Sequence, residues 1–233
     1  MNDTEPQKSI LPGPKPGLWA TIRAFVRENP HVWLVLLLPL YLALFFLTEW
    51  YVSPDKPYWS SYIPLDDKIP FLEGFALPYC MWYPFLVAVG LYLLFKDAAG
   101  FRKYMAFIFI GFCSALLFCI LVPNGQDLRP DPFPRKNIFT WMLGRIYAAD
   151  TNTNVFPSMH VIGSIGGVIA VFRCKGLKKF RAPAAVLAFL ISISTVFVKQ
   201  HSALDIFGGI LWCLPLWLFI YRLPDLRAAK KKQ

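Results

Sequence analysis

Residues 104–122 read YMAFIFIGFCSALLFCILV, 19 positions without a charged side chain. A helix of that length rises about 28 Å, and the hydrocarbon core of a bilayer is about 30 Å thick. Arg102 and Lys103 stand immediately before the stretch, and Pro123 follows it. The stretch therefore predicts a helix that crosses a membrane.

Five other stretches have the same character, so we expect six spans in all, at residues 30–48, 76–95, 104–122, 154–172, 182–198 and 202–221. Hydrophobic residues make up 56% of the chain, charged residues only 16%, and the mean hydropathy is +0.46. That composition excludes a soluble enzyme and a disordered chain. We predict an all-α, six-helix membrane domain at 30–222, between a polar N-terminal segment at 1–29 and a basic tail at 223–233.

The distribution of basic residues predicts the orientation. Seventeen of the 24 Lys and Arg fall in the termini and the loops on their side, and seven fall in the opposite loops. Positive residues favour the cytoplasmic side, so both termini are expected there. The net charge of +10 then reflects topology and attraction to anionic lipid, and no nucleic-acid partner is expected. The five cysteines show neither metal-ligand spacing nor pairing.

The two long connections, residues 49–75 and 123–153, both fall on the predicted outer side. Long loops within a compact domain are usually functional. Residues 137–150 carry apolar side chains at helical spacing and predict a short helix lying in the interface. We expect this helix to cover a site that opens on the outer side.

Two of the three histidines fall at that outer side. His160 lies in the first turns of the fourth expected span, and His201 lies where the fifth meets the sixth. Asp205 follows His201 by four positions, so the two share one helix face if the sixth span begins near Gln200. A carboxylate in a membrane span is a functional candidate, and His201 is its expected partner. The aspartate would keep one ring nitrogen protonated and leave the other with a lone pair. His31 is expected only to lie at the opposite interface.

The segment 156–160 predicts an anion site. Pro157 suits the first turn of a helix, which would leave free backbone N–H groups around Ser158 and Met159. Such groups at the positive end of a helix dipole favour phosphate. Arg129, in the preceding outer loop, adds a cation whose fork geometry matches phosphate oxygens.

Each feature also has a structural interpretation. His201 and Asp205 alone are as well explained by a hydrogen bond between helices, Pro157 by a kink, and Arg129 by contact with lipid headgroups. The functional interpretation is favoured because all of them fall on one predicted face of the membrane.

The order Arg129-Pro130, then Phe156-Pro157-Ser158-Met159-His160, then Ser194, His201 and Asp205 resembles the three motifs of the type-2 phosphatidic acid phosphatase and haloperoxidase superfamily. Those motifs are KxxxxxxRP, PSGH and SRxxxxxHxxxD. They cover residues 122–205, and the expected helices extend the resemblance over most of the chain. The resemblance implies a lipid-phosphate enzyme that needs no cofactor and no metal.

The chain departs from the motifs at three positions. Val122 stands where the family has lysine, Thr195 where it has arginine, and Met159 where it has glycine. We expect Lys199, one helical turn past Thr195, to supply a replacement cation, and Gln126 to add a neutral donor. These departures resemble the branch that includes inositol phosphorylceramide and sphingomyelin synthases.

The expected mechanism is nucleophilic catalysis through a phosphohistidine. His201, oriented by Asp205, attacks phosphorus, while Arg129, Lys199, Gln126 and the N–H groups near Ser158 hold the phosphate oxygens. His160 protonates the departing alcohol and then activates the acceptor. Water as acceptor makes the protein a lipid phosphatase, which we favour, and a lipid alcohol makes it a headgroup phosphotransferase. A non-enzymatic transporter or assembly subunit is the alternative from another class. The pattern leaves open which lipid phosphate is the substrate and how many chains assemble.

Overall fold

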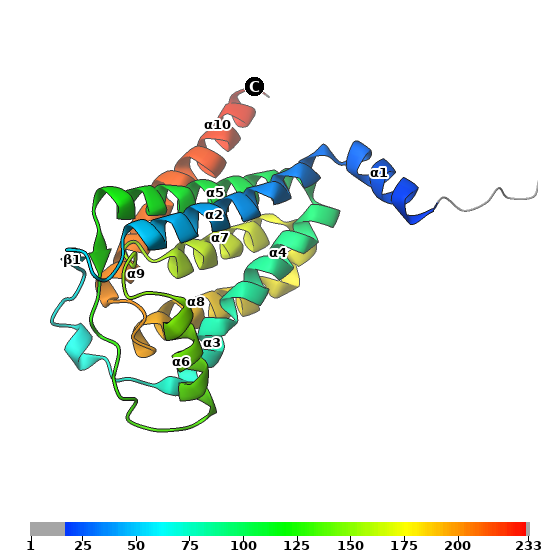
Figure 1. Cartoon of the computed structure of the whole chain (residues 1–233). Coiled ribbons are helices and arrows are strands. Elements are labelled where there is room, and N and C mark those ends of the chain that lie inside the picture. The colour runs from blue at the N-terminus through cyan, green and yellow to red at the C-terminus, as the bar shows by residue number, and fades with distance from the viewer. Residues whose placement is uncertain (1–16, 232–233) are drawn as a thin grey trace, which may run out of the picture.

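The computed structural model describes residues 17–231, and helices form its body (Figure 1). They are α1 (Leu18–Glu28), α2 (Leu37–Tyr51), α3 (Ala76–Cys80), α4 (Trp82–Lys96), α5 (Ala98–Leu121), α6 (Ile138–Ala149), α7 (Met159–Arg173), α8 (Arg181–Phe197), α9 (Ala203–Trp217) and α10 (Leu223–Lys230). Four 3₁₀ segments, Pro30–Leu36, Asp66–Lys68, Glu73–Phe75 and Lys175–Phe180, and a π turn, Leu218–Arg222, accompany them, with two short strands, β1 (Trp59–Ser60) and β2 (Asn124–Gly125). The predicted all-α class is confirmed. Residues 1–16 and 232–233 of the expected terminal segments lie outside the described residues.

Five helical segments of the described chain are long and apolar enough to cross a membrane. They are Pro30–Tyr51, Glu73–Lys96, Ala98–Leu121, Lys175–Phe197 and Ala203–Lys230. The fourth expected span, 154–172, is instead the 15-residue helix α7, which rises only about 22 Å. The chain is therefore a multi-pass membrane protein with five spans of full length and one shorter apolar helix. The last span also runs further than expected, because the π turn carries α9 directly into α10.

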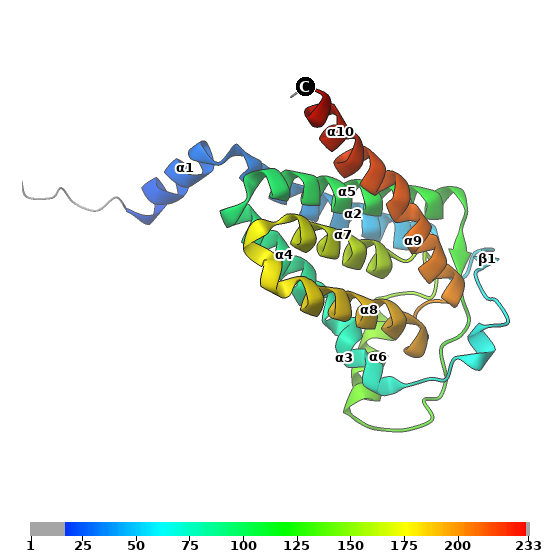
Figure 2. The ribbon, with the colours of Figure 1, turned by 180° about the vertical axis from the view of Figure 1, so that it is seen from behind.

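Helix α7 lies at the centre of the bundle. It contacts α4, α5, α8 and α9, and Figures 1 and 2 both show it between α5 and α8. Glycines allow this close packing: a Cβ at Gly163 would lie 2.8 Å from the Trp82 ring nitrogen, and one at Gly167 would lie 2.7 Å from the Phe85 ring. Because its neighbours cover α7 along most of its length, residues near its first turn are held in a packed interior.

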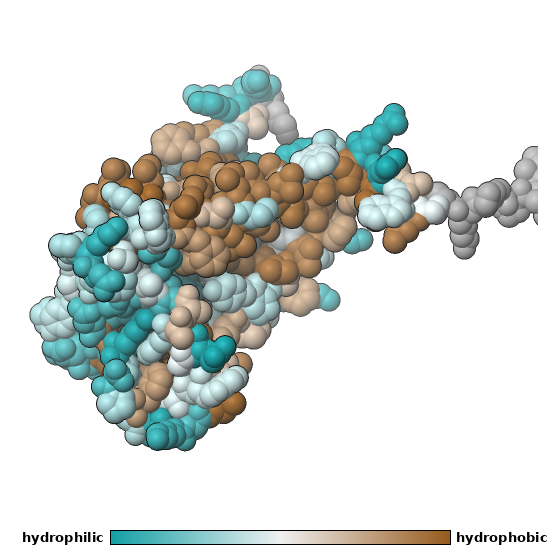
Figure 3. All heavy atoms as spheres, in the orientation of Figure 1, coloured by the Kyte–Doolittle hydropathy of each residue, from teal (hydrophilic) through white to brown (hydrophobic). Residues whose placement is uncertain are grey.

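The outer surface of the bundle is apolar. Large hydrophobic side chains such as Leu42, Phe46, Leu117, Phe189 and Leu211 are exposed. Figure 3 shows this hydrophobic surface along the bundle and a hydrophilic surface where the long loops gather. Exposed apolar side chains in a band are expected where helices face lipid tails.

The two long loops meet at one end of the bundle, which we call the loop end (residues 52–75 and 122–158). Strands β1 and β2 pair in parallel, with Trp59 opposite Asn124 and Ser60 opposite Gly125. Helix α6, predicted from the sequence at 137–150, is present, and an Asn137–Thr140 capping box begins it. It contacts α3 at the loop end. The loops thus form an ordered layer over the ends of the central helices.

Candidate active site

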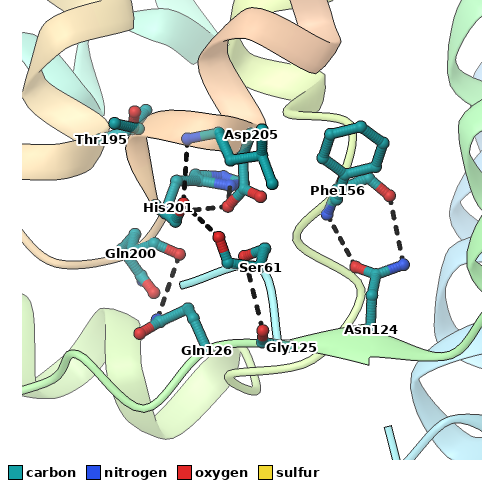
Figure 4. A network of polar contacts seen from close by, with 12 residues as sticks. Ser61, Asn124, Gly125, Gln126, Phe156, Thr195, Gln200, His201 and Asp205 are labelled. Atoms are coloured by element: carbon teal, nitrogen blue, oxygen red, sulfur yellow. Dashed lines mark hydrogen bonds and ion pairs between the residues drawn. The ribbon is translucent and has the colours of Figure 1, made fainter. Parts of the chain in front are cut away.

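His201 and Asp205 are in contact, but not across one helix face as predicted. Helix α9 begins only at Ala203, so His201 precedes it, and Asp205 occupies the third helical position of a capping box. The Asp205 carboxylate accepts a bond from the Ser202 N–H at 2.9 Å and lies 3.2 Å from Nδ1 of His201 (Figure 4). Asp205 is completely buried. A buried carboxylate on Nδ1 makes that nitrogen the donor and leaves Nε2 as the nucleophilic nitrogen.

The loop before α9 is fixed from both sides. The N–H groups of Gln200 and His201 both donate to the Thr195 carbonyl at the end of α8, and the Ser202 hydroxyl donates to the Ser61 carbonyl at 2.7 Å. Figure 4 shows Thr195, Gln200 and Ser61 around His201. The His201 backbone is thereby held between α8 and the first long loop.

His160 lies in the first turn of α7, and its ring centroid is 5.6 Å from that of His201. The rings of Tyr79 and Trp82 pack against it, with centroids 4.4 and 4.5 Å away. Its Nε2 atom is buried and forms no hydrogen bond. The two histidines separated by 41 positions in sequence are thus neighbours, and one ligand between them can contact both.

The sequence predicts Pro157 in the first turn of this helix. In the structure Ser158 is the N-cap of α7, so Pro157 lies before the helix. The Ser158 N–H is not free, because it donates to the Asp205 carbonyl at 3.1 Å. The Ser158 hydroxyl is buried without a partner. The N–H groups that the start of α7 offers to an anion are therefore those of Met159 and His160, one residue further along the chain than predicted.

Asn124 fixes the approach to α7. Its Oδ1 accepts the Phe156 N–H at 2.8 Å, and its Nδ2 donates to the Phe156 carbonyl at 3.2 Å (Figure 4). Asn124 lies three positions after the last residue of α5, so these bonds tie the end of α5 to the start of α7. No sequence pattern points to this role, because the two partners are 32 positions apart.

Arg129 lies behind the site in the second long loop. Its NH1 donates to the Asp150 carbonyl at 2.9 Å, and its NH2 donates to the Thr151 carbonyl at 2.5 Å and to Oε1 of Gln200. Its guanidinium also stacks on the Tyr147 ring, 4.6 Å from the centroid. The Nε–H is buried with no partner, and burial lowers the pKa of Arg129. Arg129 is thus a rigid, partly desolvated cation.

Gln200 was not identified from the sequence, although it precedes His201. The side chain is 2% exposed, its Oε1 accepts from Arg129, and its Nε2 has no partner. A buried amide N–H left without an acceptor is costly unless a ligand satisfies it. Gln200 therefore joins Arg129 and the histidines as a candidate ligand-binding residue.

The structure contradicts the predicted role of Lys199. Its backbone has a φ of 54°, and its ammonium donates to the Asp66 and Ile69 carbonyls at 3.0 and 2.6 Å, in the first long loop. Helix α8 has ended at Phe197, so Lys199 does not continue the face that carries Thr195. Lys199 fastens the loop and does not replace a phosphate-binding cation.

Gln126 is also occupied elsewhere. Its Nε2 donates to the Lys199 and Gln200 carbonyls at 3.0 and 3.3 Å, and its Oε1 accepts from the Leu128 N–H. With every polar atom bonded, this buried amide has no donor left for a ligand. It instead holds the turn that carries Gln200 and His201.

Both histidines open on a cavity of about 340 Å³. Its wall includes Gln200, two carboxylate side chains, and apolar and aromatic groups from α2, α3 and α4. Leu42 and Phe46, which line it, are also among the exposed apolar residues of the bundle. The cavity thus connects the buried polar site with the surface that faces lipid.

The two positions where the family motifs have a cation, Val122 and Thr195, carry no cation to this cavity. Val122 ends α5 and is 39% exposed, and the Thr195 hydroxyl donates to the Ser192 carbonyl within α8. Lys199 is bonded to the first long loop. Among the lysines and arginines of residues 17–231, it is therefore Arg129 that hydrogen bonds connect to this site, through Gln200.

Comparison with known proteins agrees with this geometry. Residues 126–228 match the family model of the PAP2 superfamily, a span that contains Arg129, both site histidines and Asp205. No curated protein and no solved structure matches the chain. Over residues 126–228, which are somewhat less than half of the chain, this multi-pass membrane protein is similar to the PAP2 superfamily.

Proposed function

We propose that this protein is an integral-membrane lipid phosphate phosphatase that works through a phosphohistidine intermediate. The observation that carries the proposal is the approach of the His160 and His201 rings to 5.6 Å across one cavity, with Asp205 on Nδ1 of His201. A nucleophile, a proton donor and an orienting carboxylate are the three roles that nucleophilic catalysis requires.

In the first half-reaction, the His201 Nε2 lone pair attacks phosphorus and forms the N–P bond. The bond from phosphorus to the lipid oxygen breaks, and His160 gives its proton to that oxygen, so the alcohol leaves neutral. In the second half-reaction, neutral His160 takes a proton from water, and the resulting hydroxide displaces His201. Phosphate is released, and both histidines return to their starting states.

The charge that develops on the phosphate oxygens has three candidate partners. The first is Arg129, held by Gln200 and by loop carbonyls. The second is Nε2 of Gln200, and the third is the N-terminus of α7 at Met159 and His160. Fixed donors in a partly desolvated site stabilise a transition state because they need no reorganisation.

A second candidate function is transfer of the phospho-headgroup to a lipid alcohol. Two observations favour it: the family cations are absent at Val122 and Thr195, and the cavity wall includes the lipid-facing Leu42 and Phe46. A second lipid would then take the place of water in the same two steps.

The acceptor is tested with purified protein and labelled phosphatidate in detergent micelles. Release of inorganic phosphate without any added alcohol supports the phosphatase. Label that appears only in a new phospholipid after a lipid alcohol is added supports the transferase. Full activity of His201→Ala, or complete loss of activity with a chelator, contradicts the proposed mechanism for both.

We further propose six membrane passes, cytoplasmic termini and an extracytoplasmic active site. Six passes agree with the alternating directions in which the chain runs through α2, α4, α5, α7, α8 and α9 (Figures 1 and 2), and the charge distribution favours this orientation. An impermeant maleimide should label a cysteine at Asp55 in intact cells and label one at Lys230 only after lysis. The reverse pattern would place the site on the cytoplasmic side.

A further inference from the structure

The cavity that holds the two histidines also carries two carboxylates. Glu49 comes from α2, and Asp150 is the residue that ends α6. A carboxylate beside a bound phosphate is unfavourable, because like charges repel strongly where water is scarce. Both acids therefore need a role that accounts for their position.

Glu49 has a structural role. Its Oε1 accepts from Nδ2 of Asn154 at 2.7 Å, and its Oε2 accepts from the Thr151 hydroxyl at 2.5 Å. These bonds tie α2 to the segment that leads into α7. The donors are neutral, so the negative charge of the site is not cancelled.

Asp150 has no such partner. Within residues 17–231, its carboxylate accepts no hydrogen bond and forms no ion pair, and its contact with Arg129 is made through the backbone carbonyl. The side chain is half-buried and lines the cavity. An unpaired carboxylate at a cavity wall is open to a cation that enters with the ligand.

Aromatic rings surround the same space. Tyr41, Tyr79, Trp82 and Tyr83 all line the cavity. The negative faces of such rings attract organic ammonium groups. A carboxylate and several rings together form the usual environment for a bound ammonium.

The other part of the wall is suited to an anion. Nε2 of Gln200 and Nε2 of His160 are buried without partners, in side chains that are 2% and 8% exposed. Both residues line the cavity. The cavity therefore offers unsatisfied polar nitrogens to an anion and an unpaired carboxylate to a cation, within about 340 Å³.

Resting on the proposed function, we propose that Asp150 and the surrounding rings bind an ammonium group that the substrate carries a few bonds from its phosphate. Two kinds of lipid have this chemistry. One is a phosphodiester with an amino-alcohol headgroup, and the other is the phosphate of a sphingoid base.

Two matched pairs of substrates test the subsite and distinguish these sources. Phosphatidylethanolamine and phosphatidylglycerol differ in the ammonium of a phosphodiester headgroup. Sphingosine 1-phosphate and its N-acetyl derivative differ in the ammonium of a phosphomonoester. The pair that the full chain turns over in detergent micelles identifies the source.

The variant is Asp150→Asn, which keeps the shape and the backbone carbonyl that Arg129 uses. Its control is Asp55→Asn, the same change of charge at an exposed turn outside the cavity. We expect Asp150→Asn to lower kcat/KM about tenfold or more on the ammonium member, as for loss of a contact to a charged group. The member without the ammonium should change by less than about threefold, and Asp55→Asn should affect neither member.

An equal fall in kcat/KM for both members of a pair, or a wild-type preference for the member without the ammonium, overturns the subsite. Binding of the same pairs to His201→Ala, followed by intrinsic tryptophan fluorescence, provides a readout without turnover. If no lipid is turned over, the proposed function fails, while the ratio of the two Kd values still decides whether Asp150 selects the ammonium.

Discussion

At the scale of single residues, the geometry of the site depends on the two contacts of the Asp205 carboxylate, with Ser202 and with His201. One carboxylate oxygen accepts from the Ser202 N–H that caps α9 and also faces Nδ1 of His201. The same oxygen therefore both caps the helix and orients the His201 ring, the proposed nucleophile.

Replacing Asp205 by Asn should reduce kcat strongly and leave KM nearly unchanged. The amide stabilises the wrong ring tautomer, and a change of this kind costs about 10⁴-fold in a serine protease triad. We expect a loss of at least about 100-fold on labelled lipid phosphate. Asp205→Glu should recover part of the activity if orientation is the cause, whereas equal loss in both variants would point to a folding defect.

If Asp150 binds the substrate ammonium as proposed, the choice of substrate should depend on pH. Burial raises the pKa of Asp150 to about 6, and the nearby Glu49 adds to the rise. The carboxyl is therefore neutral below about pH 6 and ionised above it, so preference for an ammonium-bearing substrate should increase as pH rises through that value. The ratio of kcat/KM for the two members of a matched pair measures this preference.

Taking that ratio removes the effects of the other groups around Asp150, which are Glu49, Arg129, His160, His201, Tyr41, Tyr79, Tyr83 and Tyr147. Their titration acts on both substrates alike. In Asp150→Asn the ratio should be flat between about pH 5 and pH 7. A ratio that still rises in this variant would assign the titration to another group.

At the scale of elements, the loops are fastened to the helices by buried polar side chains. The sequence predicts Lys199 and Gln126 as phosphate ligands. In the structure Lys199 donates to backbone carbonyls of the first long loop, and Gln126 donates to the carbonyls of Lys199 and Gln200. Polar side chains near an active site are often required for this purpose, since buried carbonyls need donors. Spacing in the sequence cannot distinguish the two roles.

Replacing Lys199 by Met should destabilise the protein without weakening phosphate binding. The Asp66 and Ile69 carbonyls would lose their donor, at a cost of about 1–3 kcal/mol. We expect a lower Tm in detergent and a KM for lipid phosphate within about threefold of wild type. Lys68→Met, at an exposed neighbouring lysine, serves as the control. A KM increased tenfold at unchanged Tm would restore Lys199 as a ligand.

At the scale of the whole molecule, the bundle is arranged around α7. The helix has 15 residues, whereas the continuous helical segments that contain its neighbours α4, α5, α8 and α9 have 23 to 28. Its first turn therefore lies below the loop layer, where His160 meets His201. A full-length span at this position would carry His160 closer to water.

Gly209 keeps α9 close to the start of α7. A Cβ at this position would lie 3.0 Å from the Ser158 carbonyl and 2.8 Å from Val161. Because the carbonyl belongs to the backbone, Gly209→Val should separate the helices, lower stability by about 1–3 kcal/mol and reduce kcat by disturbing the two histidines. Tm and kcat measured on the same preparation check both effects. Gly74→Ala is the control, since its Cβ would meet no atom within 4 Å, and unchanged activity in Gly209→Val would contradict this account.

The amino-acid sequence alone determined the membrane class, five of the spans, the loop helix at 137–150 and the family motifs. These depend on local quantities: the length of apolar runs, turn chemistry and short spacings. It also singled out His160, His201, Asp205 and Arg129 as candidates, because few titratable groups occur near apolar spans, and their role as site residues stays a prediction.

Only the tertiary structure decided which groups the polar side chains at and next to the loop end contact. Lys199 turns toward the first loop, Gln200 is left with a free donor beside Arg129, and Asp150 remains unpaired at the cavity. Each outcome depends on which carbonyls and cations other segments bring within about 3 Å, and those segments are far apart in the chain. The physical reason is that hydrogen bonds and ion pairs depend on distances in space, whereas the sequence determines only the order of the groups.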